Sequence, residues 1–122
     1  MKRLLVVDDA LFMRRLIGGV AAEAGWEVVG EAGDGAEGVA LYDQLRPDLV
    51  TMDLVMPNMG GIEALQKIRE LDPSARVVVI TAVDQKQSLM DSIRHGAVDF
   101  IVKPFDRDRV ISLLNKLAAS PS

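Results

Sequence analysis

The sequence predicts an α/β fold in which helices cover both faces of a parallel sheet. Short aliphatic and β-branched runs alternate with segments of helical periodicity along the 122 residues, which is typical of consecutive strand–helix units. Three of the five apolar runs are almost continuously aliphatic, as expected of strands that are buried on both faces. Because parallel crossovers are right-handed, five such units favour a doubly wound sheet of five strands and five helices.

The strands are expected at the five apolar runs, and four of these runs end in chemically distinct polar residues. They fall at residues 3–7, 27–32, 49–52, 76–81 and 98–102. No run approaches the length that a membrane-spanning helix needs, so the sequence predicts no membrane segment.

The first helix is predicted by apolar residues at helical spacing, followed by Gly25 as a C-terminal stop. These residues are Met13, Leu16, Ile17, Val20 and Ala24. Three weaker helices are expected before Pro47, Pro73 and Gly96, at residues 36–45, 62–71 and 85–95.

The last helix has the clearest apolar stripe, and Asp106 stands where its side chain can cap the helix start. The stripe consists of Val110, Leu113, Leu114 and Leu117. Every helix in the alternation is therefore expected to bury one face against the sheet.

Composition narrows the class of protein further. A chain of 122 residues with 49% hydrophobic residues can bury one core, so residues 1–122 are expected to form a single domain. The net charge of −4 argues against nucleic acid as a partner.

The absence of cysteine excludes disulfides and thiolate metal sites, and it fits a reducing cytoplasm. The apolar run at residues 4–7 ends at Asp8, too early for an export signal.

The strand ends carry the chemistry, because ligands of doubly wound sheets bind beyond the carboxyl ends of the strands. These ends hold Asp8 and Asp9, then Gly33 and Asp34, then Asp53, then Thr81, then Lys103 with Pro104. Several carboxylates on one rim suit a hard cation such as Mg²⁺, with Mn²⁺ as an alternative. A cation, an ammonium group and a hydroxyl suit phosphoryl transfer, and Asp53 is the best-placed nucleophile.

Four segments resemble the response-regulator receiver domain: LVTMDLVMPNMGG (residues 49–61), VVDDALFMRR, VVVITAV and DFIVKPF. The VDDALFMR and FIVKPF segments are most similar to the chemotaxis members, the CheY-like proteins. The resemblance covers essentially all 122 residues. It implies the flavodoxin-like receiver fold with strand order 2-1-3-4-5.

The resemblance assigns a role to each strand-end residue. Asp53 would be the phosphoacceptor, with Thr81 and Lys103 contacting the phosphoryl oxygens and Thr81 and Phe100 forming a switch pair. Asp9, Asp53 and the carbonyl of Val55 would ligate Mg²⁺ directly, whereas Asp8 would act mostly through a water. The bond between Lys103 and Pro104 is expected to be cis.

The resemblance also implies a function and partners. The protein would be a monomeric cytoplasmic response regulator that receives a phosphoryl group from a CheA-like histidine kinase. It would be a switch and not an enzyme, and its fourth helix, last strand and last helix would bind an output protein, in chemotaxis the flagellar switch. The alternatives are a receiver domain taken from a larger regulator, such as a transcription factor or methylesterase, and a binding module that is never phosphorylated.

Two motifs point to other chemistry and are disfavoured. GDGAEG (residues 33–38) matches the glycine pattern of dinucleotide sites, but Asp34 and Glu37 lie where a pyrophosphate would sit. Haloacid-dehalogenase-like phosphatases carry a second Asp two residues after the nucleophile, where this chain has Val55. Taken in isolation, Asp8 and Asp9 could instead cap the first helix, and Phe100 could serve only in packing.

Overall fold

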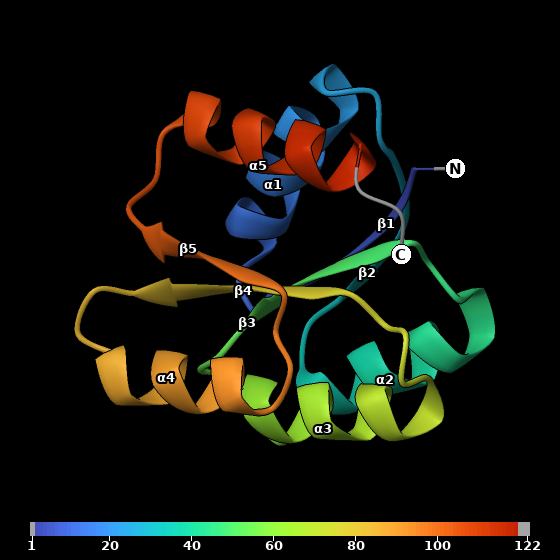
Figure 1. Ribbon diagram of the computed structural model, residues 1–122, viewed down its shortest axis with the longest axis vertical. Coiled ribbons are helices and arrows are strands. Elements are labelled where there is room, and N and C mark those ends of the chain that lie inside the picture. The colour runs from blue at the N-terminus through green and yellow to red at the C-terminus, as the bar shows by residue number, and fades with distance from the viewer. Residues whose placement is uncertain (1, 120–122) are drawn as a thin grey trace.

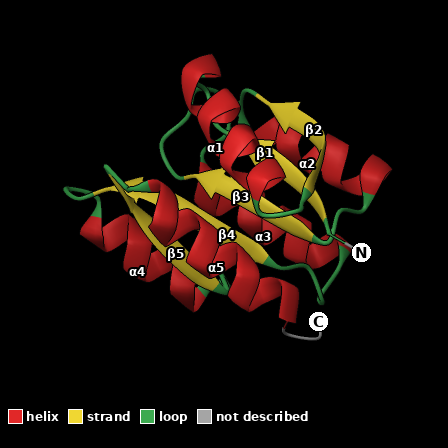
Figure 2. Cartoon of the chain, turned by 90° about the horizontal axis from the view of Figure 1, so that it is seen from above, coloured by secondary structure: helices red, strands yellow, loops and turns green. Residues whose placement is uncertain are grey.

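The computed structural model describes residues 2–119 as a five-stranded parallel sheet between two helical layers (Figure 1). The strands are β1 (Arg3–Val7), β2 (Glu27–Ala32), β3 (Leu49–Asp53), β4 (Val77–Ala82) and β5 (Asp99–Lys103). The helices are α1 (Leu11–Glu23), α2 (Gly35–Leu45), α3 (Gly61–Leu71), α4 (Lys86–Arg94) and α5 (Arg107–Ala119). Helices α1 and α5 cover one face, and α2, α3 and α4 cover the other (Figures 1 and 2).

The strand order is β2-β1-β3-β4-β5, which confirms the order that the resemblance implied. The boundaries differ from the prediction mainly at the functional end of the sheet. Asp53 and Lys103 were expected just beyond their strands, but both lie within them, because Asp53 pairs with Ile80 and Lys103 pairs with Ala82 in the ladder. Their backbones are therefore fixed by neighbouring strands.

The helix starts show which acidic residues serve as caps. Asp106 accepts a hydrogen bond from the Arg109 backbone N–H at 2.8 Å, as predicted. Asp34 caps α2 by accepting from the Glu37 N–H at 2.8 Å, which confirms the interpretation of residues 33–38 as a turn and helix start. Helix α1 has no side-chain cap, so the disfavoured alternative, in which Asp8 and Asp9 serve as its cap, does not hold.

Side-chain alternation along the strands divides the core between the two faces. Leu4, Val6, Leu49, Ile80 and Ile101 belong to the cluster under α1 and α5, whereas their neighbours along the strands belong to the cluster under α2 and α3. Since successive side chains point to opposite faces, this alternation decides where each strand-end side chain lies. No helix within residues 2–119 is long and apolar enough to cross a lipid bilayer.

Candidate functional site

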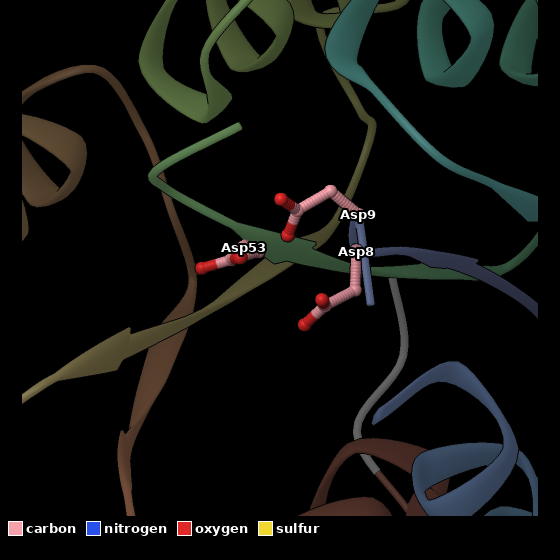
Figure 3. A group of neighbouring side chains, drawn as sticks. All are labelled: Asp8, Asp9 and Asp53. Carbon is pink, nitrogen blue, oxygen red and sulfur yellow. The ribbon is translucent and has the colours of Figure 1, made fainter. Parts of the chain in front are cut away.

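Three aspartates form a compact acidic group at the carboxyl ends of β1 and β3 (Figure 3). Asp8, Asp9 and Asp53 each offer a carboxylate oxygen, and these oxygens all lie within 4.8 Å of one another. Asp8 is 1% exposed and Asp53 is 8% exposed, whereas Asp9 is open to solvent. Two buried carboxylates at this spacing repel each other strongly unless a positive group is close.

Lys103 is that positive group. Its Nζ lies 3.2 Å from Asp8 Oδ2 and 3.6 Å from Asp53 Oδ1. Asp8, Asp53 and Lys103 lie two or four residues after Val6, Leu49 and Ile101, which belong to the cluster under α1 and α5, so the alternation sends all three side chains to that face. Lys103 must reach across β4, because β4 lies between β5 and β3. Its partner on β4 is Ala82, a residue small enough to leave that path open.

Burial and a neighbouring carboxylate raise the pKa of Asp53 above its usual value. Burial is the largest cause, and the neighbouring carboxylate of Asp8 is the second. Lys103 and the backbone N–H of Val55 act in the opposite direction. The folded protein therefore disfavours the ionised form of Asp53, which is the form that an added cation would stabilise.

The donor set fits a hard divalent cation. It consists of carboxylate oxygens from two adjacent strand ends, which is the chemistry that Mg²⁺ and Mn²⁺ prefer. Both oxygens of Asp8 already have partners, because Oδ1 accepts from the Ala10 N–H at 2.9 Å and Oδ2 faces Lys103. Asp9 is exposed, so its carboxylate is the more available of the pair.

Thr81 and Phe100 lie on the opposite face of the sheet from Asp8 and Asp53. Phe100 pairs with Val79 on β4, and Thr81 follows Val79 by two residues. The side chains of Thr81 and Phe100 therefore point toward the same face of the sheet, which α3 and α4 cover. Thr81 is 1% exposed, and its Oγ1 has no hydrogen-bond partner within residues 2–119. Phe100 is about one-third exposed at the rim. Residues 2–119 thus hold a buried hydroxyl without a hydrogen-bond partner on the same face of the sheet as a partly exposed aromatic ring.

Lys103 and Val55 complete the set of predicted residues. The bond between Lys103 and Pro104 is cis, as expected. Val55 follows β3 with 59% of its surface exposed, and its N–H donates to the Asp53 carboxylate. All the predicted strand-end residues therefore gather at one end of the sheet.

Two residues near the site were not predicted to matter, namely Ala82 and Gly61. Gly61 begins α3, and a Cβ there would collide with the Asp53 carbonyl oxygen and lie 2.8 Å from Leu54 Cα. The only signal in the sequence is the Gly60–Gly61 pair, and spacing alone cannot show what a glycine touches. Gly61 lets the start of α3 approach the backbone of Asp53.

Gly61→Ala is expected to destabilise the protein by about 2 kcal/mol, because the added methyl group meets backbone atoms that cannot move aside. Urea unfolding measures this change. Gly19→Ala is the matched control: Gly19 lies inside α1 with nothing within 4 Å of an added Cβ, so it should stabilise by up to about 1 kcal/mol. Similar effects of the two substitutions would contradict the close approach.

Comparisons with known proteins agree with this geometry. The family model for the response regulator receiver domain matches residues 4–115. The chain is 48% identical to the chemotaxis protein CheY of Thermotoga maritima over 96% of this chain and 98% of that protein. It is 49% identical to CheY of Listeria monocytogenes, covering 97% of this chain and 99% of that protein.

A solved structure described as the CheX-CheY-BeF3-Mg²⁺ complex from Borrelia burgdorferi has a TM-score of 0.91. Its sequence is 35% identical, and the match covers 98% of this chain and 90% of that chain. The match to the family model spans β2 to β5, all of β1 except Arg3, and most of α5. This chain therefore belongs to the response regulator receiver domain family and is highly similar to the CheY chemotaxis response regulators.

Proposed function

We propose that residues 1–122 act as one phosphorylation-dependent switch, in which Asp53 receives a phosphoryl group from a histidine kinase. The observation that carries this proposal is the position of Asp53, whose carboxylate lies within 4.8 Å of Asp8 and Asp9 and 3.6 Å from Lys103 Nζ. An isolated carboxylate would not accept another anion easily. Here an ammonium group and a set of cation ligands surround the acceptor.

In the proposed reaction, a carboxylate oxygen of Asp53 attacks the phosphorus of a kinase phosphohistidine. The new O–P bond forms as the N–P bond breaks, and the released imidazole takes up a proton. Lys103 would contact one phosphoryl oxygen and Thr81 Oγ1 another. A Mg²⁺ ion held by Asp9, Asp53 and the Val55 carbonyl, with Asp8 acting through a water, would supply charge neutralisation. A small phosphodonor could replace the kinase, and water could later hydrolyse the acyl phosphate.

The switch would follow from this added charge. A phosphoryl group carries nearly two negative charges and three strong acceptor oxygens, so it offers the buried Thr81 hydroxyl a hydrogen-bond partner that residues 2–119 do not supply. Movement of Thr81 toward it would leave room for Phe100 to turn inward. The surface made by α4, β5 and α5 would then change its affinity for an output protein.

The charge-assisted bonds are too few to drive this change to completion. Each contributes about 1.5–3 kcal/mol, whereas moving an equilibrium from about 1:99 to 99:1 needs roughly 5.5 kcal/mol. We therefore propose a partial shift that the bound partner completes. Phosphorylated, partner-free protein with a single, fully converted set of NMR signals would contradict this proposal.

For partners, we propose a CheA-like kinase and a flagellar switch protein, with a monomer in the cytoplasm. Support comes from the relatives named as chemotaxis CheY proteins, which the chain matches over nearly their whole length. The Borrelia burgdorferi complex supports Mg²⁺ as the cation. The alternative, a receiver domain from a larger regulator, keeps the same chemistry but changes the output partner.

Affinity capture tests the proposed output directly. The immobilised protein would be presented with Mg²⁺, with and without beryllofluoride as a phosphoryl analogue on Asp53. We expect a flagellar switch protein to be retained only with the analogue, because the output surface is exposed in the activated state. Equal retention in both states would favour the binding module that does not depend on phosphorylation.

Val55→Asn is expected to accelerate loss of the phosphoryl group several-fold. Val55 and Val83 lie two residues beyond Asp53 and Thr81, with 59% and 76% of their surfaces exposed, so aliphatic groups would flank the phosphoryl group and slow the approach of water. Release of radiolabelled phosphate measures the rate. Val98→Asn removes an exposed valine away from the site and should change nothing. No acceleration in Val55→Asn would refute this role.

A further inference from the structure

We infer that Arg14 is a positioning residue that fixes the Asp8–Asp9 peptide for divalent-cation binding. This inference rests on the proposed function. Arg14 Nη1 donates to the Asp8 carbonyl oxygen at 2.7 Å, and Arg14 Nε donates to Glu31 Oε1 at 3.0 Å. One guanidinium group thus joins α1 to the carboxyl-terminal ends of β1 and β2.

The start of α1 has little local support beyond the hydrogen bond from the Ala10 N–H to Asp8 Oδ1. The N-cap residue is Ala10, no side chain caps the helix, and its first turn holds no acidic residue. Asp8 and Asp9 directly precede the cap, but using them as caps would withdraw their carboxylates from the site. A contact made from the side of the helix to the Asp8 carbonyl uses no carboxylate oxygen of Asp8 or Asp9.

The Asp8 carbonyl is the critical atom in this arrangement. The other polar groups of Asp8 are held by different neighbours: its N–H donates to the Ala32 carbonyl at 3.0 Å, and its carboxylate contacts Ala10 and Lys103. The carbonyl of Asp8 and the N–H of Asp9 belong to one planar peptide. Fixing that carbonyl therefore fixes the direction in which the chain carries the exposed Asp9 side chain.

Glu31 orients the guanidinium. It pairs with Val6 across the β1–β2 ladder, so its side chain lies near the carboxyl-terminal end of β1, which Asp8 follows. The side chain of Arg14 is 18% exposed and that of Glu31 is 31% exposed, which favours a defined geometry. A lysine at residue 14 would keep the charge but lacks the rigid fork that holds two acceptors at once.

Arg15 provides a matched comparison. It also contacts Glu31, with Nε 3.3 Å from Oε2, but 71% of its side chain is exposed and its one contact to these residues is with Glu31. Replacing either arginine by glutamine removes one positive charge near the acidic group. If charge alone mattered, both replacements would strengthen cation binding, since less repulsion would oppose the cation. Loss of the contact between Arg14 and the Asp8 carbonyl would instead weaken cation binding.

The experiment measures the Mg²⁺ dissociation constant of the whole chain by calorimetry, with Mn²⁺ paramagnetic resonance as a spectroscopic readout. For Arg14→Gln we expect about tenfold weaker binding, as found when residues that orient metal ligands are lost, and for Arg14→Lys a similar loss. For Arg15→Gln we expect unchanged or slightly tighter binding. Urea unfolding without metal reports the stability of each variant.

The outcomes separate this inference from the proposed function. Wild-type protein that binds no Mg²⁺ would overturn the proposed site and the inference together. Wild-type protein that binds Mg²⁺, with folded Arg14→Gln binding as tightly or tighter, would overturn the role of Arg14 alone. If Arg14→Gln fails to fold, Arg14→Lys decides: full Mg²⁺ affinity there would overturn the need for the guanidinium fork.

Discussion

Asp53→Asn is expected to abolish covalent labelling by a small phosphodonor such as acetyl phosphate and to raise the free energy of unfolding in metal-free buffer. Labelling is lost because an amide oxygen is a poor nucleophile toward phosphorus. Stability rises because burial and Asp8 raise the pKa of Asp53, so the ionised carboxylate destabilises the folded state. Phosphate incorporation and urea unfolding measure the two effects.

The gain in stability should depend on pH in a defined direction. A raised pKa means that the folded protein binds the Asp53 proton more tightly than the unfolded chain does, so ionisation opposes folding as the pH rises. The advantage of Asp53→Asn should be present at neutral pH and disappear in acid. Asp43→Asn is the control, since Asp43 forms an exposed ion pair with Arg46, and exposed pairs contribute little. Full labelling of Asp53→Asn would contradict the assignment of the acceptor.

Lys103→Met is expected to lower the free energy of unfolding by about 3 kcal/mol at pH 7 without metal, because removing one partner of a buried pair leaves a carboxylate uncompensated. Asp8, which is 1% exposed, would lose a cation at 3.2 Å, and Asp53 would lose one at 3.6 Å. Methionine keeps much of the length of the side chain, so packing changes little. Urea unfolding measures the loss.

Two conditions and one control variant test that interpretation of Lys103. The deficit should shrink in acid, where Asp53 takes up a proton, and it should shrink with Mg²⁺, which restores positive charge beside the carboxylates. Lys116→Met is the control, because Lys116 is 72% exposed where it pairs with Asp99 and its removal should change stability by less than about 1 kcal/mol. Equal losses from both lysine variants would show that Lys103 does not compensate the aspartates.

The sequence order and type of the ten elements could be predicted from the sequence because apolar runs, three of them almost continuous, alternate with segments of helical periodicity. The stripe of α5 and its cap, Asp106, were placed correctly. The prediction was weakest at the functional end of the sheet, where Asp53 and Lys103 belong to their strands. The polar residues at this end look like loop residues in the sequence. They belong to the strands because they pair with neighbouring strands that are far away in the sequence.

The candidate site could be predicted because parallel strands deliver their last residues to one edge. The position of the strand ends does not show which positive group compensates the aspartates. A cation was expected to compensate Asp8, and the structure shows that Lys103 also does so, across β4 and past Ala82. The contacts of Gly61 and Arg14 were equally hidden, since each depends on the close approach of segments that the sequence separates.

The most direct test of the central claim is to locate the phosphoryl group. Protein labelled by a phosphodonor in the presence of Mg²⁺ would be reduced with borohydride, which converts an aspartyl phosphate to homoserine, and its peptides would be analysed by mass spectrometry. We expect homoserine at residue 53 and unchanged aspartate at residues 8 and 9. Homoserine at residue 8 or 9, or labelled protein with Asp53 unmodified, would contradict the assignment.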